Sequence, residues 1–72
     1  MAYYPRLKDL REDNDLTQRK IAELLLITQQ QYSLYENGYR DIPSAYLISL
    51  ADLYKTSVDY IMGRTDNPDP IK

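Results

Sequence analysis

Residues 17–38, with the sequence TQRKIAELLLITQQQYSLYENG, contain two helix starts and one helix stop. Thr17 and Thr28 are N-cap residues, whose hydroxyl oxygens can accept hydrogen bonds from backbone N–H groups of the first turn. Each threonine follows an apolar residue and precedes another at the fourth helical position, the spacing of a hydrophobic staple. Asn37-Gly38 is a strong stop signal, because both residue types tolerate a left-handed backbone. The stretch predicts two short helices joined by only about two or three residues.

Similar signals divide the rest of the chain into helices. Proline suits the first position of a helix, serine caps one, and Asn-Asp and glycine end one. The predicted boundaries are Pro5 to Asn14-Asp15 for the first helix, Pro43 to Tyr54 for the fourth and Ser57 to Gly63 for the fifth. Nothing shows the two-residue alternation of strands. We predict an all-α domain of five helices over residues 1–63, followed by a flexible C-terminal tail at residues 64–72.

The composition excludes several classes of chemistry. The 72 residues include no cysteine and no histidine, which excludes disulfides, thiolate chemistry, zinc fingers and histidine-assisted nucleophiles. There is no glycine-rich phosphate loop, and no hydrophobic run approaches the roughly 20 residues that span a bilayer. We therefore predict a binding domain rather than an enzyme, with no catalytic residue, no metal, no small-molecule cofactor and no membrane segment.

The second helix of the quoted stretch has an unusual outer face. At 3.6 residues per turn, Tyr32 and Tyr35 fall on its inner side. The outer face carries uncharged side chains, namely Gln29, Gln30, Ser33, Leu34 and Asn37. Glutamine can form a bidentate pair with adenine, and leucine can contact a thymine methyl group. So short a connection fits a helix-turn-helix, in which the second helix enters the DNA major groove. The alternative is a chance run of polar residues, and Gln31 is either a cap residue or a base contact.

Cations flank this face, although the chain as a whole is acidic. The net charge is −2 and the isoelectric point is about 4.8, which argues mildly against binding nucleic acid. Arg19 and Lys20 lie in the first turn of the preceding helix, where the free N–H groups also favour a phosphate. They can equally pair with Glu23 on their own helix. Tyr39 and Arg40, just past the outer-face helix, can also reach a phosphate.

Five spaced segments carry a wider pattern. They are RLKDLR at 6–11, LTQ at 16–18, IAEL at 21–24, TQQQYSLYENG at 28–38 and SVDYIMG at 57–63. Together they resemble the phage-repressor and Cro-like helix-turn-helix family, also called the xenobiotic-response-element type. The resemblance implies a sequence-specific transcriptional repressor that binds double-stranded, pseudo-palindromic operator DNA as a homodimer in a bacterial cytoplasm.

The resemblance also implies roles for individual residues. Gln18 would contact a phosphate and brace Gln29. Gln29 and Gln30 would lead the base contacts, with Ser33 and Leu34 nearby. Arg11 of the first helix would form an ion pair with Glu36 of the third. The complete set predicted to contact the DNA backbone is Thr17, Gln18, Arg19, Thr28, Asn37, Tyr39 and Arg40.

Two positions depart from the family pattern, and two questions stay open. Leu26 stands in the turn where the family commonly has glycine, which predicts a strained backbone, and Leu34 stands where a polar base contact is common. The side chains that could serve either dimerisation or the core are Tyr54, Tyr60, Ile61 and Met62. The alternative function is a protein-interaction module on the same fold, such as an antitoxin, antirepressor or dimerising adaptor, whose acidic surface meets a protein.

Overall fold

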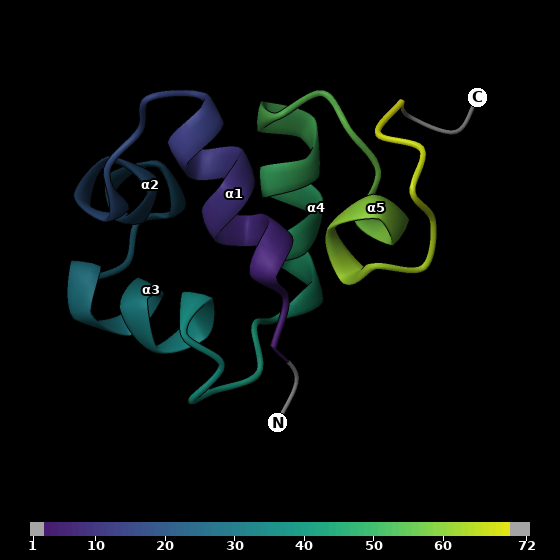
Figure 1. The fold of residues 1–72 in the computed structure, drawn as a ribbon. Coiled ribbons are helices and arrows are strands. Elements are labelled where there is room, and N and C mark those ends of the chain that lie inside the picture. Colours follow the sequence, from purple (N-terminus) through teal and green to yellow (C-terminus); the bar gives the residue numbers. More distant parts are fainter. Residues whose placement is uncertain (1–2, 70–72) are drawn as a thin grey trace.

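The computed structural model describes residues 3–69 and consists of five helices (Figure 1). These are α1 (Pro5–Asp13), α2 (Gln18–Leu25), α3 (Gln29–Glu36), α4 (Ser44–Leu53) and α5 (Val58–Met62). No strand occurs in this part of the chain, and the predicted all-α, five-helix class is confirmed. None of the helices formed by residues 3–69 has the length and apolar character that crossing a membrane requires.

The helices begin where the sequence predicts because the expected caps form. The hydroxyl of Thr17 accepts the backbone N–H of Lys20 at 3.1 Å, and that of Thr28 accepts the N–H of Gln31 at 3.0 Å. Ser57 caps α5 in the same way. Each cap satisfies a donor that the first turn leaves unpaired.

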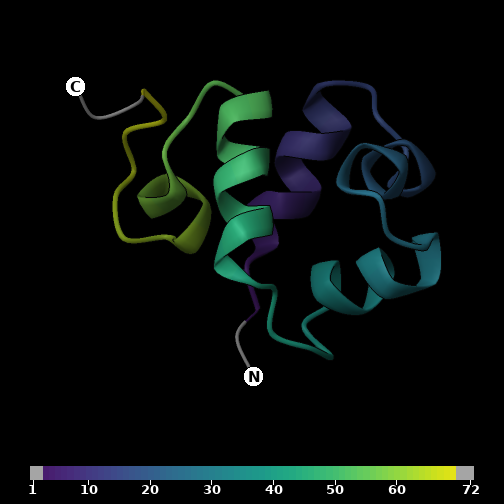
Figure 2. The same ribbon diagram turned by 180° about the vertical axis from the view of Figure 1, so that it is seen from behind.

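A single core joins all five helices. Each helix contributes one side chain that is at most 1% exposed: Leu7, Ile21, Tyr32, Leu50 and Ile61. Burying such a side chain stabilises the fold by about 1.5–3 kcal/mol. Seen from both sides, α2 and α3 lie on one flank of α1, while α4 and α5 lie on the other (Figures 1 and 2). The core therefore fixes α2 and α3 as one unit against the rest of the domain.

The sequence left open whether four side chains serve the core or a dimer contact, and most of them lie in the core. Ile61 is 1% exposed, and Tyr54 and Met62 pack against the buried cluster. The ring of Tyr60 lies under the Arg6 guanidinium, 4.1 Å from it. These four side chains therefore have partners within the monomer.

The described part of the C-terminal tail, residues 64–69, contacts the domain through Arg6. The Arg6 guanidinium donates to the carbonyl oxygen of Thr65 at 2.6 Å and pairs with the Asp66 carboxylate at 2.7 Å. The boundary after residue 63 and the flexibility of residues 64–72 stay predictions, and residues 70–72 lie outside the described part.

The turn between α2 and α3 has the predicted strain at Leu26. This residue has φ 60° and ψ 40°, and its side chain is 91% exposed. A left-handed backbone costs a residue with a Cβ about 1–2 kcal/mol. Glycine removes that cost but loses about 0.5–1 kcal/mol to the entropy of the unfolded chain. We expect Leu26→Gly to raise the melting temperature by a few degrees in thermal unfolding followed by circular dichroism, at about 4–8 °C per kcal/mol.

Leu26→Ala is the matched control for this prediction. Alanine removes most of the exposed side chain yet keeps the Cβ, so its backbone strain persists. The melting temperature of Leu26→Ala should stay close to that of the unmodified protein. A Leu26→Gly variant that melts below Leu26→Ala would contradict the proposed strain.

The hydroxyl of Tyr54 is buried without a hydrogen-bond partner among residues 3–69. Burial, with a contribution from the Glu36 charge, raises the pKa of this hydroxyl to about 12. A buried polar group left unpaired costs about 1–3 kcal/mol. We expect Tyr54→Phe to raise the free energy of unfolding by about 1 kcal/mol in urea titrations.

Tyr32→Phe provides the opposite expectation with the same chemical change. The Tyr32 hydroxyl donates to the Glu36 carboxylate at 3.2 Å, and a hydrogen bond to a charged group contributes about 1.5–3 kcal/mol. Its removal should therefore lower the free energy of unfolding. If Tyr54→Phe also lowered it, the Tyr54 hydroxyl would have a partner in solution, such as a bound water.

Candidate nucleic-acid interface

Helices α2 and α3 form the helix-turn-helix geometry that the sequence predicts. Three residues separate Leu25, the end of α2, from Gln29, the start of α3. The Ile27 N–H returns to the Ala22 carbonyl at 3.0 Å, which closes the turn tightly. Ala22 is 2% exposed, so a small side chain lies buried where the turn folds back. The two helices are thus held as a rigid pair.

The outer face of α3 forms a shallow groove. Tyr32 and Tyr35 are buried on the inner side, at 0% and 7% exposure. Gln29 and Gln30 are exposed, whereas Ser33 and Leu34 are half-buried. The residues that line the groove are Gln18, Gln29, Gln30, Ser33 and Leu34. The structure therefore brings all four candidate base-contacting residues together, next to the start of α2.

Most of the candidates for DNA backbone contact are exposed around this groove. The side chains concerned are Thr17, Arg19, Thr28, Asn37, Tyr39 and Arg40. The backbone N–H groups of Tyr39 and Arg40 both donate to the Leu34 carbonyl, at 2.9 and 3.2 Å. This pair of hydrogen bonds holds the loop after α3 close to the last turn of the helix.

Thr17 and Thr28 cap their helices, and two more of these side chains have partners within the monomer. Arg19 pairs with Glu23 at 3.5 Å, and both side chains are more than half exposed. So exposed a pair contributes little to stability, and Arg19 can leave it for a phosphate at small cost. Asn37 donates to the Ser33 hydroxyl at 3.1 Å, and this hydrogen bond holds the Ser33 side chain from one turn further along the chain.

The sequence left open whether Gln31 serves as a cap residue or as a base contact, and its side chain bonds within its own helix instead. Thr28 accepts the Gln31 backbone N–H, but the Gln31 side chain donates to the Tyr35 hydroxyl at 3.1 Å. Gln31 is half-buried and does not line the groove. Tyr35 lies one turn further along the helix and Thr28 one turn back, so the side chain that reaches the Tyr35 hydroxyl extends away from the Thr28 N–H that a capping box would use.

A buried carboxylate lies behind the groove. Glu36 is 2% exposed, and Arg11 donates to it from Nε at 2.8 Å and from Nη2 at 3.3 Å. The predicted ion pair between α1 and α3 is therefore present. Two further donors complete the site: the Gln18 amide nitrogen at 2.6 Å and the Tyr32 hydroxyl at 3.2 Å.

These donors keep Glu36 ionised. Burial by itself raises the pKa of the Glu36 carboxyl, but hydrogen bonds from Arg11 and Gln18 and the positive charge of Arg11 outweigh it. The net effect is a pKa below the ordinary value of 4.5. The hydrogen bond to Glu36 outweighs burial for Arg11 as well and raises the pKa of its guanidinium. Both groups are charged at neutral pH.

The contact between Gln18 and Glu36 was not predicted from the sequence. The Gln18 amide nitrogen donates to Glu36, and the bracing of Gln29 by Gln18 stays a prediction. A buried carboxylate has more lone pairs than one arginine can satisfy, and this requirement is the signal that points to an additional donor. The spacing along the chain does not reveal which amide supplies it.

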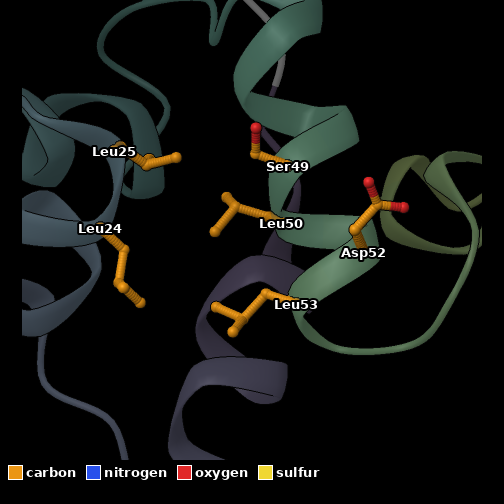
Figure 3. Close-up of a pocket in the computed structure, with 6 residues that line it drawn as sticks. All are labelled: Leu24, Leu25, Ser49, Leu50, Asp52 and Leu53. Carbon is orange, nitrogen blue, oxygen red and sulfur yellow. The ribbon is translucent and has the colours of Figure 1, made fainter.

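A second concave site was not predicted. It is an open apolar pocket of about 380 Å³ between α2 and α4, lined by Leu24, Leu25, Ser49, Leu50, Asp52 and Leu53 (Figure 3). Leu24 and Leu53 are 50% and 41% exposed. The pocket shares no lining residue with the groove. Leucine at helical spacing generally predicts burial, but Leu24 and Leu53 lie at the edge of the buried face of their helices and stay partly exposed.

Comparisons with known proteins agree with this geometry. The family model described as Helix-turn-helix matches residues 7–61. Three similar proteins come from Bacillus subtilis (strain 168): the uncharacterized HTH-type transcriptional regulator YobD (44% identical over 68 residues), the HTH-type transcriptional regulator ImmR (38% over 66) and the HTH-type transcriptional regulator AnsR (39% over 59). The matches cover 94%, 92% and 82% of this chain, but 61%, 52% and 51% of those proteins. The chain thus spans between half and two thirds of the length of these relatives.

Proposed function

Because the chain belongs to the helix-turn-helix family of the phage-repressor and Cro type, we propose that it represses transcription by binding a pseudo-palindromic operator as a homodimer. In this proposal α3 lies in the major groove. Two copies occupy successive major grooves about 34 Å apart, and the bound dimer blocks access to the DNA.

The observation that carries this proposal is the uncharged amide face of α3. Gln29 and Gln30 are exposed while the tyrosines of the same helix are buried. An α-helix with its side chains is about 10–12 Å in diameter, so α3 fits the major groove, which is about 12 Å wide. Amide groups on the exposed face of such a helix can reach base edges without removing any core contact.

The residues near the groove fit distinct roles in this complex. Gln29 and Gln30 pair with adenine edges, Ser33 adds a donor and acceptor, and the half-buried Leu34 contacts a thymine methyl group. The start of α2 faces a phosphate, because its free N–H groups and Arg19 both favour an anion. The exposed Arg40 side chain approaches a second phosphate from the loop after α3. Phosphate contacts position the protein, and base contacts provide the sequence preference.

A selection from random double-stranded oligonucleotides at moderate salt tests the proposal. We expect enrichment of a palindromic sequence whose half-sites lie one helical turn apart, or a multiple of it. Binding to the enriched duplex should weaken steeply as salt rises, since each neutralised phosphate releases counterions. If no sequence were enriched, the proposed function would be wrong. A domain that instead associated with a protein independently of salt would act as an interaction module.

A further inference from the structure

Gln18 belongs to two sites at once. It lines the groove beside Gln29 and Gln30, and its amide nitrogen donates to the buried Glu36 carboxylate at 2.6 Å. Gln18 is half-buried. One side chain thus connects the polar network inside the domain with the surface that faces DNA in the proposed complex.

The carboxylate determines which way the Gln18 amide points. The oxygen and nitrogen ends of an amide have nearly the same shape, but one accepts hydrogen bonds and the other donates them. An ionised carboxylate only accepts, so a flipped amide would place its oxygen against the Glu36 oxygen with no proton between them. Only the orientation with Nε2 toward Glu36 forms a hydrogen bond.

Glu36 is itself held in place. Arg11 donates to both of its oxygens, and the Tyr32 hydroxyl donates to one of them. A group fixed by several hydrogen bonds loses little entropy when a ligand arrives. The second Nε2–H and the oxygen of Gln18 remain available, and their polarity is set before DNA binds.

We propose that Glu36 is a positioning residue for DNA recognition, which orients the Gln18 amide so that its second N–H donates to a phosphate of the operator. This inference rests on the proposed function. A purely structural role for Glu36 predicts lower stability in Glu36 variants, but it predicts no effect confined to one phosphate.

The first step of the test finds the phosphate that Gln18 contacts. Each phosphate of the selected duplex is replaced in turn by a neutral methylphosphonate, and affinities are measured for the unmodified protein and for Gln18→Ala. At one position in each half-site we expect the replacement to weaken the unmodified protein by about 10-fold, the scale of a hydrogen bond to a charged group. At this position the same replacement should leave the affinity of Gln18→Ala almost unchanged.

The second step removes the orienting charge. The neutral side chain of Glu36→Gln can both donate and accept, so it no longer excludes the flipped Gln18 amide. In Glu36→Gln, we expect the methylphosphonate at the phosphate that Gln18 contacts to weaken binding by less than about 3-fold, because a charge-assisted hydrogen bond has been lost. The effects at other phosphates should persist. Because Glu36→Gln leaves Arg11 without a charged partner, the Arg11→Met/Glu36→Gln double variant repeats the measurement without an unpaired charge.

Tyr32→Phe is the matched control. It removes one hydrogen bond to Glu36 but leaves the carboxylate and its contact with Gln18 intact. In Tyr32→Phe, the methylphosphonate at the Gln18 phosphate should therefore weaken binding as much as it does in the unmodified protein. All variants are compared at a low temperature at which circular dichroism shows each to be folded.

The possible results separate this inference from the proposed function. If both Glu36 variants retained the full effect at the Gln18 phosphate, or if Gln18→Ala lost sensitivity at no phosphate, the positioning role would be wrong although operator binding would stand. If no duplex were selected, the proposed function would fail, and the positioning role with it. Loss of the effect in both Glu36 variants but not in Tyr32→Phe would support the positioning role.

Discussion

Replacing Arg11 by methionine is expected to lower the free energy of unfolding by about 3–5 kcal/mol. The Arg11 side chain is 12% exposed and that of Glu36 is 1% exposed, and their nearest atoms are 2.8 Å apart. Methionine fills much of the same space without a charge, so the Glu36 carboxylate would stay buried without a cation. At about 4–8 °C per kcal/mol, the melting temperature should fall by more than 10 °C in calorimetry.

A double variant separates the unpaired charge from the loss of packing. Arg11→Met/Glu36→Gln removes both charges and keeps one amide oxygen, which can still accept from Gln18 or from Tyr32. Neutral replacement of a buried ion pair is often close to neutral for stability, so the double variant should recover most of the loss. Equal melting temperatures for the single and double variants would show that packing, not charge, accounts for the effect.

The pH dependence of stability gives an independent check with a definite sign. In the unmodified protein the pKa of Glu36 lies below its ordinary value of 4.5, so the contribution of Glu36 is present above pH 4.5 and is lost in stronger acid. In Arg11→Met, burial without the cation should raise this pKa above 4.5. Acid then favours the folded form of the variant. The difference in stability between the two proteins should therefore narrow as the pH falls from 7 to 4.5.

Local signals in the sequence were sufficient to predict the helices. The caps at Thr17, Thr28 and Ser57 act through backbone groups a few residues away, so each helix start depends on its own neighbourhood. The strained turn at Leu26 was also predictable, because the family resemblance places glycine there. The Arg11–Glu36 pair joins residues distant in sequence, and only the resemblance indicated it.

Contacts between side chains of different helices were less predictable. The short connection predicts that α2 and α3 form a helix-turn-helix, but it does not predict which side chains meet between them, such as the Gln18 amide and Glu36. The Tyr54 hydroxyl lies without a partner among residues 3–69, although a buried hydroxyl usually has one. In a capping box the Gln31 amide oxygen would accept the Thr28 backbone N–H, whereas in the structure the Gln31 amide nitrogen donates to the Tyr35 hydroxyl. The spacing along the helix allows both arrangements and does not decide between them.

Alanine at Gln29 or Gln30 is expected to remove discrimination at particular base pairs of the operator. Both side chains are exposed on the first turn of α3, and alanine is a good helix former, so the fold should be unaffected. The unmodified protein should disfavour a wrong base pair at each contacted position by about 1–3 kcal/mol. At one position of the operator, we expect Gln29→Ala and Gln30→Ala each to bind the right and the wrong base pair almost equally. Competition assays against every single-base-pair variant of the selected duplex measure this preference.

Arg40→Ala provides the contrast that makes this result specific. Arg40 is exposed in the loop after α3 and is proposed to contact a phosphate, so its loss should weaken binding to all duplexes alike. The slope of the logarithm of affinity against the logarithm of salt concentration should fall in magnitude by about 1. Glutamine variants that weakened every duplex equally, with no change in preference at any base pair, would place Gln29 and Gln30 among the backbone contacts. The sequence preference would then come from Leu34 and Ser33 or from the shape of the DNA. Proteins can recognise DNA shape without contacting base edges.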